Sequence, residues 1–460
     1  MIRLASIAVA TLALSAPALA SQSQVHVVEG QHDLLGGDLD GTALSPDGVV
    51  RVGPALKQLT TDALTGPVLA LARGGDGALY AATASPGRVW KIVEGSKPEV
   101  ILESDKALVT AVLPVGKQKL VALTAPDGGA EVIDLGTKKH ETVLAKDAKM
   151  LLAGAVIDDV VYAVGGGDEG VLLKLAPNAK AWEVVAKTKE AQLRSIAVAK
   201  VNGVLKIVVG GGEEGVIYDV TAGKVRALLD TAPTEITALA IGADGTVFAS
   251  AVDGEGKLSK GAVAKAKDDA SDDKLSSAEK DKKQKARKVK SAEVWRIDPQ
   301  GRARVLWQSK DHGAYALALL DGKLLAGTGP EGRIYEIDES GGRAAGVFLR
   351  MKDHDEVTAL RVEGESVLFG TAHAPAVVRA DKSAATRGVY LSPALDGEAL
   401  ARYGAVASRG RGSITLSVRT GNTKEPDDTW SAFSAPTAAP LGQYAQVRAE
   451  LTGKAELEGV

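Results

Sequence analysis

Acidic residues recur at one kind of turn along this 460-residue chain, and they are the residues best placed to do chemistry. Each lies beside glycine or proline between two apolar segments: Asp127, Asp168, Glu169, Glu213, Glu214, Asp253, Glu255 and Glu331. Carboxylates gathered at one mouth would form a cation site, because Ca²⁺ prefers several carboxylate and carbonyl oxygens. The candidate metal ligands are Asp168, Glu169, Glu213, Glu214, Asp253 and Glu331. The alternative interpretation is that they are ordinary solvated turn residues.

Other chemical signals in the sequence are weak. The six histidines form no H-x-H or H-E-x-x-H pattern. His312 and His354 precede apolar strands, where an acid–base or metal role competes with a solvated loop. The absence of cysteine excludes thiol catalysis and Cys-based zinc sites, and no Walker loop or G-x-S-x-G motif occurs. We therefore expect no required cofactor, keep Ca²⁺ as a candidate ligand, and favour a non-enzymatic role.

A repeated segment positions the acidic turns. Its copies start at Leu79, Leu120, Tyr162, Ile207, Val247, Leu324 and Val367, so that the spacings are 41, 42, 45, 40, 77 and 43 residues. Removing a 35-residue charged insertion, residues 257–291, from the long interval leaves 77 − 35 = 42. A repeat of about 40 residues with several short strands is typical of a β-propeller. We predict an all-β fold, with a seven-bladed propeller over residues 21–385.

Each repeat predicts a four-stranded antiparallel blade. In the first copy the strands are expected at residues 68–72, 79–83, 88–93 and 99–102, separated by glycine-containing turns. The turns between second and third strands then share a rim with the loops between blades, which would bring the acids to one mouth. The seventh copy lacks a fourth strand of its own. We expect residues 41–59 to supply the missing outer strand or strands and to close the ring.

The insertion is the main charge asymmetry in the chain. Residues 257–291 hold twelve Lys/Arg and six Asp/Glu, a local charge of +6 within a total of −3. Such a segment buries too little apolar surface to fold alone, so we expect a disordered or loosely helical loop in blade five. It is either an electrostatic tether for an acidic partner, such as anionic lipid or wall polymer, or a tolerated loop extension. The acidic total argues against a nucleic-acid binder.

The first 20 residues have the pattern of a secretory signal peptide. Arg3 precedes an apolar stretch over residues 4–14, and Ala18-Leu19-Ala20 supplies small residues at the cleavage positions. The alternative is a buried N-terminal strand or helix. We predict cleavage after Ala20 and a periplasmic or secreted protein. No later apolar run is long enough to predict a transmembrane segment.

The sequence changes character near residue 386. Residues 414–418 alternate as a strand, a long hairpin loop follows with Trp430 near its base, and residues 444–451 read as the last strand. We predict a small β-sandwich-like C-terminal module over residues 386–460. Its candidate ligand contacts, for a glycan or the cell wall, are Arg419, Asn422, Asp427 and Trp430.

Two sequence patterns resemble known families. The linked S-P-x-x-D and R-x-G-N-T…D-x-T-W-S pattern, from Tyr390 to Ser434, resembles small β-sandwich modules that follow propellers in secreted bacterial proteins. The repeated V-x-A-L…DG-x-L/V-x-A/V-G…G-x-V/I-Y/W-x-I pattern resembles secreted bacterial seven-bladed propellers of the NHL/WD40-like type, without the Gly-His and Trp-Asp pairs of WD40 repeats. The resemblance implies architecture and no activity.

Three functions fit the sequence. The first is a scaffold that binds an envelope protein or another ligand through its loops, since recognition on a rigid fold resides on loops. The second is a divalent-cation-dependent propeller hydrolase, lactonase or lyase. The third is glycan or cell-wall binding through the C-terminal module. We expect a monomer.

Overall fold

The computed structural model describes residues 24–60, 64–255, 288–341 and 345–460. The chain is all-β, with 3% of residues in helices and 60% in strands, as predicted. The expected signal peptide and nearly all of the charged insertion lie outside the described residues. Within those residues, no helix is both long enough and apolar enough to span a bilayer.

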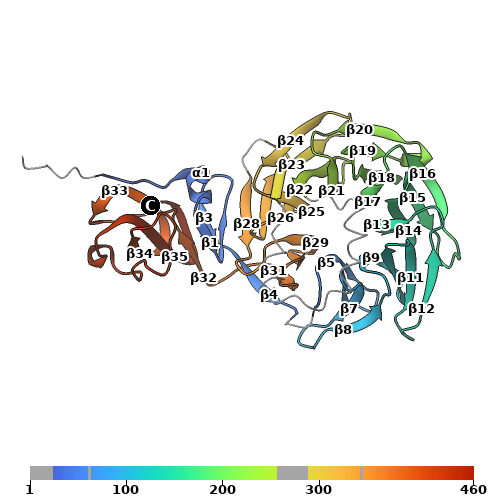
Figure 1. Ribbon diagram of the computed structural model, residues 1–460, viewed down its shortest axis with the longest axis horizontal. Coiled ribbons are helices and arrows are strands. Elements are labelled where there is room, and N and C mark those ends of the chain that lie inside the picture. Colours follow the sequence, from blue (N-terminus) through green and yellow to red (C-terminus); the bar gives the residue numbers. More distant parts are fainter. Residues whose placement is uncertain (1–23, 61–63, 256–287, 342–344) are drawn as a thin grey trace, which may run out of the picture.

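The fold is a β-propeller in which six blades are separate four-stranded antiparallel sheets (Figure 1). Three of them are β5 (Val68–Arg73), β6 (Leu79–Thr83), β7 (Arg88–Ile92) and β8 (Glu99–Glu103); β9 (Leu108–Val115), β10 (Lys119–Ala125), β11 (Gly129–Asp134) and β12 (His140–Leu144); and β13 (Met150–Ile157), β14 (Val160–Gly166), β15 (Gly170–Leu175) and β16 (Glu183–Thr188). Two more are β17 (Leu193–Val201), β18 (Val204–Gly211), β19 (Val216–Asp219) and β20 (Arg226–Asp230); and β21 (Glu235–Ile241), β22 (Val247–Glu255), β23 (Lys288–Ile297) and β24 (Ala303–Ser309). The second strands are almost wholly buried, since apolar residues there pack against both neighbouring sheets.

The sixth separate sheet closes the ring with a strand from the N-terminus. It comprises β29 (Val357–Glu363), β30 (Ser366–Thr371), β31 (Val377–Ala384) and β4 (Pro54–Gln58). Gln58 pairs with Val378, and Leu56 pairs with Ala380. The prediction that the segment before the first repeat completes the last blade is therefore confirmed for residues 54–58.

Strands β25 (Gly313–Leu320), β26 (Lys323–Gly329), β27 (Arg333–Asp338) and β28 (Gly346–Arg350) follow the same order but belong to a larger sheet. That sheet has eleven strands and also contains β1 (Asp38–Asp40), β2 (Thr42–Leu44), β3 (Val50–Val52), β32 (Arg387–Leu391), β33 (Leu395–Ala401), β34 (Arg409–Gly421) and β35 (Gly442–Gly459). Strand β2 pairs with β28 on one side and with β3 on the other, and β3 pairs with β35. The N-terminal strands thus join the ring to the C-terminal strands.

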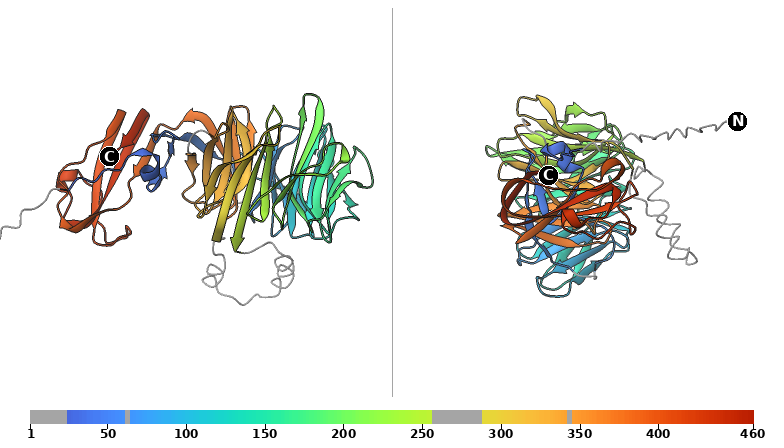
Figure 2. Two further views of the ribbon diagram at one scale, coloured as in Figure 1. Left: turned by 90° about the horizontal axis from the view of Figure 1, so that it is seen from above. Right: turned by 90° about the vertical axis from the view of Figure 1, so that its left-hand side faces the viewer.

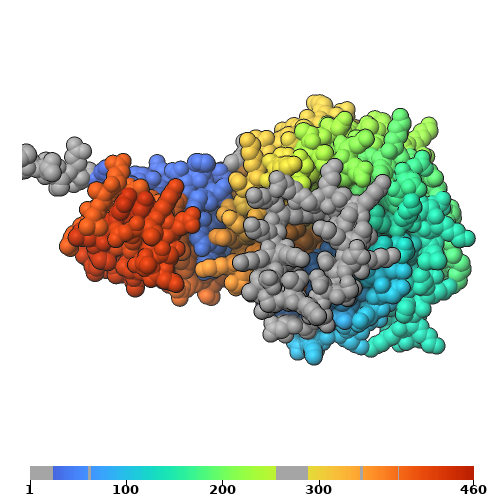
Figure 3. All heavy atoms as spheres, viewed as in Figure 1, coloured from blue at the N-terminus to red at the C-terminus, as the bar shows by residue number. Residues whose placement is uncertain are grey.

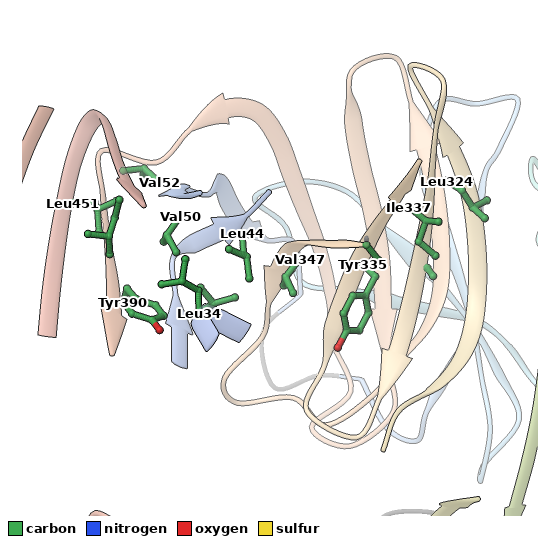
Figure 4. Packing of buried hydrophobic residues seen from close by; sticks show 14 of the residues in the cluster. Leu34, Leu44, Val50, Val52, Leu324, Tyr335, Ile337, Val347, Tyr390 and Leu451 are labelled. Atoms are coloured by element: carbon green, nitrogen blue, oxygen red, sulfur yellow. The ribbon is translucent and has the colours of Figure 1, made fainter. Parts of the chain in front are cut away.

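One hydrophobic core spans this junction. It includes Leu324, Tyr335, Ile337 and Val347 from the ring, Leu34, Leu44, Val50 and Val52 from the N-terminal segment, and Tyr390 and Leu451 from the C-terminal strands (Figure 4). Leu34 lies on the short helix α1 (Gly30–Leu35). The C-terminal strands lie beside the ring, with the N-terminal residues between the two (Figures 2 and 3).

Two predicted boundaries are wrong. Residues 42–52 were expected with the closing strand, but β2 and β3 pair with β28 and β35, because their apolar residues complete the shared core. Residues 288–291 were assigned to the insertion, but they lie in β23, where Ser291 pairs with Asp253 and Val289 with Gly254. The β22–β23 hairpin therefore extends further from the ring than its apolar residues indicate.

Candidate functional site

The structure separates most of the predicted metal ligands. Asp168 lies 2.9 Å from Lys149 Nζ, and Glu169 lies 3.1 Å from Lys187 Nζ. The backbone amides of Glu213 and Glu214 donate to the buried carboxylate of Glu190, at 3.1 and 3.3 Å. The described ranges contain no group of three His, Asp or Glu side chains arranged to hold a metal ion.

Asp253 does not lie on a turn. It lies inside β22 opposite Ser291, because that strand continues to residue 255. The expectation that it belongs to the same class of turn as Glu331 is therefore wrong.

Glu331 and His312 are the predicted residues that the structure does bring together. Glu331 Oε2 lies 3.6 Å from His312 Nε2 and 2.7 Å from Arg333 Nη2, and Arg350 Nη2 lies at 3.9 Å. Arg350 also pairs with Asp38 of β1. We call these five residues the Glu331 cluster. The glutamate side chain is 43% exposed, so the cluster reaches the surface.

Local backbone geometry places Glu331. The β26–β27 turn runs through Gly329-Pro330-Glu331-Gly332, and Glu331 has φ = 78°, in the left-handed region. A Cβ at Gly332 would lie 2.0 Å from the carbonyl oxygen of His354, so only glycine fits against the next loop. The tight turn directs the carboxylate toward His312, in the loop just before β25, and toward Arg350 at the end of β28.

The electrostatics of the cluster keep Glu331 ionised. The contact with His312, together with the charges of Arg333 and Arg350, lowers the pKa of Glu331 to about 2 despite partial burial. Below it, Tyr335 Oη lies 3.4 Å from Arg333 Nη1 and 3.5 Å from His312 Nδ1, and burial raises the pKa of Tyr335. The cluster therefore presents an ionised carboxylate held between two arginines at the rim, an arrangement that can recognise a polar partner.

The first strand of each four-stranded unit of the ring, which we call the inner strand, has a register shift near its start. The inner strands are β5, β9, β13, β17, β21, β25 and β29. The shifts in the pairing with the second strand occur at Leu69, Thr110, Leu152, Arg194, Thr237, Tyr315 and Thr358. Bulges redirect side chains, and here several contact the next sheet: Thr110 donates to the Leu151 carbonyl at 2.8 Å and Thr237 to that of Ala314 at 2.6 Å. Arg194 instead forms a 2.7 Å ion pair with Glu235.

Sequence reasoning missed Arg333, Arg350, Asp38 and the Arg194–Glu235 pair. A basic residue at the start of the third strand was a usable signal for Arg333. No sequence signal indicated Asp38, because its partner Arg350 is remote in the chain. His354 is buried, with Nδ1 2.7 Å from the Ala374 carbonyl oxygen and 3.3 Å from Thr371 Oγ1, so it serves the packing of its loop.

The four predicted residues of the C-terminal strands lie near one another but are engaged internally. Trp430 is buried and donates to Thr423 Oγ1 at 2.8 Å. Asn422 Oδ1 accepts from the Gln443 amide at 3.0 Å, and Asp427 Oδ1 accepts from the Thr429 amide at 2.8 Å. Arg419 stacks with its Cζ 5.5 Å from the Trp430 ring centroid. The tryptophan face is thus covered by protein.

Comparison with known proteins gives the fold alone. No family model and no curated protein matches the chain. Among solved structures, the extracellular domain of the putative hybrid two component system BT4673 from B. thetaiotaomicron is similar at a TM-score of 0.51 and 11% identity. The alignment covers 72% of this chain and 40% of that one. The WD40 beta propeller domain of Doa1 aligns at a TM-score of 0.49 and 12% identity, over 71% of this chain and 97% of that one.

Proposed function

We propose that this chain is a binding scaffold built on a seven-bladed propeller, with β25–β28 as the blade that is fused to the eleven-stranded sheet. The observation that carries the proposal is the closed circuit of inner strands. Strands β5, β9, β13, β17, β21, β25 and β29 each contact the next, and β29 contacts β5. A closed ring with an N-terminal closing strand holds its loops rigidly, which suits recognition.

The recognition surface we assign is the rim around the Glu331 cluster. It combines a half-exposed carboxylate with two arginines and a histidine, drawn from the β26–β27 turn, the end of β28 and the loop before β25. Residues 1–20 as a signal peptide, and a periplasmic or secreted location, remain part of the proposal. The C-terminal strands form a β-sandwich-like module in this account.

Affinity capture from envelope extract tests the scaffold function. The full mature chain is immobilised, and retained proteins and glycans are identified by mass spectrometry. We expect Glu331→Gln combined with Arg350→Gln to lose the captured partner. The control is Glu169→Gln, which alters an acidic turn residue of another blade and should retain it. Equal capture by all three forms, or no specific capture by the natural chain, contradicts the proposal.

Neither alternative function gains support from a specific contact. A cation-dependent hydrolase needs converging oxygen ligands, whereas Asp168, Glu169 and Glu331 each pair with a separate lysine or arginine. Glycan binding through Trp430 needs an accessible ring face, whereas this ring is buried. Melting curves with Ca²⁺ and with a chelator test the first alternative; a rise of Tm with Ca²⁺ would favour it over the scaffold.

A further inference from the structure

The outer edge of β34 is open over residues 409–417. The strand pairs with β35 along its length, and on its other side Val418 exchanges two 2.9 Å backbone hydrogen bonds with Ser434. Among the described residues, no strand pairs with residues 409–417 on that side. Hydrogen-bonding direction alternates along a strand, so Ile414 and Leu416 point their N–H and C=O groups to the same edge as Val418. Such an edge is a template for an added strand.

The solvent face beside this edge is basic. Arg419 lies opposite Gln446 and Ser417 lies opposite Arg448, so both arginines share a face with Thr415 and Ser417. On the same face, Arg387 of β32 bonds Glu450 at 2.9 Å, and Arg448 lies 3.4 Å from that glutamate. Two of the three guanidinium groups on this face thus share one carboxylate, in a chain whose net charge is −3.

Arg419 has no carboxylate within ion-pair distance in the described part of the chain. Its Nε and Nη2 both donate to the neutral Gln446 Oε1, at 2.9 and 2.6 Å. The Phe433 ring centroid lies 4.9 Å from its Cζ and 5.7 Å from that of Arg448. Partial burial of the guanidinium group lowers the pKa of Arg419. A charge kept partly out of water without a counter-charge is costly, and a ligand carboxylate would offset that cost.

The opposite face of the edge is apolar. Ile414 and Leu416 are half-buried and pack against the core shared by the ring and the C-terminal strands. An added strand would place alternate side chains beside these two residues and the others beside Thr415 and Ser417, near the arginines. Because one face is apolar and the other is basic, the edge favours a peptide in which apolar and acidic side chains alternate.

We propose that the β34 edge binds an extended peptide segment in which acidic and apolar residues alternate, by strand addition. The peptide backbone would bond to Ile414 and Leu416, and its carboxylates would pair with Arg419 and Arg448. This surface lies on the C-terminal strands and is distinct from the Glu331 cluster, so the two proposals stand or fall separately.

Fluorescence anisotropy with the full mature chain tests the inference. The probe is a labelled Val-Asp-Val-Glu-Val-Asp peptide, and we expect saturable binding that weakens as salt rises. Arg419→Gln combined with Arg448→Gln should raise Kd by on the order of tenfold or more. The matched control is Arg226→Gln, an exposed arginine of β20, which should leave Kd unchanged.

Two altered peptides keep the test independent of protein stability. Replacing the acids with lysine should abolish binding, and N-methylation of alternate backbone amides should weaken it by about tenfold or more, because strand addition needs those donors. Undiminished binding of the N-methylated peptide overturns strand addition. Undiminished binding of the lysine peptide would contradict the proposal that the ligand is acidic. Self-association of the chain through this edge, with exclusion of the probe, would contradict it as well.

Discussion

Gln58 pairs with Val378, so the segment that precedes the first repeat becomes the outer strand of the last blade. Next to this pair, the Leu59 amide donates to the Val377 carbonyl oxygen at 2.8 Å, and the Val377 amide donates to Thr60 Oγ1 at 2.9 Å. Closure therefore uses backbone pairing together with one buried hydroxyl. The binding proposal depends on this closure, because an open ring would not hold its loops in fixed positions.

Thr60→Ala tests the closing contact. Thr60 is buried, and its loss leaves the Val377 amide without its acceptor, so we expect the free energy of unfolding to fall by about 1–3 kcal/mol. Urea unfolding measures the change. Thr60→Ser keeps the hydroxyl and should lose much less. An alanine variant as stable as the natural chain would show that the contact does not contribute to closure.

The charge of Glu331 predicts a pH dependence of stability. Its folded pKa is about 2 against an ordinary 4.5, so its contribution is fully present above pH 4.5 and is lost as the pH falls toward 2. We expect Glu331→Gln to lower the free energy of unfolding at pH 7 by roughly 1 kcal/mol, a small value because the side chain is 43% exposed. The difference from the natural chain should vanish near pH 2. Glu169→Gln, the exposed control, should change stability little at either pH.

Leu44 joins the ring to the C-terminal strands. It is 1% exposed within the shared core, and its strand pairs with β28 and β3. Leu44→Ala should cost about 2–5 kcal/mol through the cavity it leaves. Calorimetry should show one transition for the natural chain and an earlier or split transition for the variant. An unchanged single transition would mean that the junction contributes little to cooperativity.

The charged insertion is dispensable for folding in this account. Glu255 and Lys288 pair at the end of the β22–β23 hairpin, so an Asn-Gly turn can replace residues 256–287. We expect equal stability, or a gain of roughly 1–2 kcal/mol from easier loop closure, measured by urea unfolding. Unfolding of the shortened chain would show that the insertion supports the blade.

The repeated strands were predictable because each blade is a local unit. Apolar runs such as residues 79–83 and glycine turns such as residues 74–77 lie within one repeat, so strand order follows from sequence neighbours. The closing strand was predictable for the same reason: the last repeat lacked a strand and the first was preceded by one. The eleven-stranded sheet was not predictable, because nothing in the sequences of β2 and β3 indicates that they pair with β28 and β35.

The candidate sites were less predictable than the blades. Repeat spacing correctly placed most acidic residues at equivalent turns but did not reveal that Lys149 and Lys187 pair with Asp168 and Glu169. The Glu331 cluster depends on Asp38 and Arg350, which tertiary structure alone brings together. Trp430 was correctly placed near the base of its loop, but its burial follows from contacts that spacing does not encode.

Hydrogen–deuterium exchange of the captured complex tests the central claim, recognition at the Glu331 rim, most directly. We expect the partner to protect amides at residues 329–333, at 310–313 and at 349–354, and to leave the turns at residues 74–77 and 158–159 on the opposite face unchanged. Protection confined to those opposite turns, or no protection anywhere on the ring, would contradict the account.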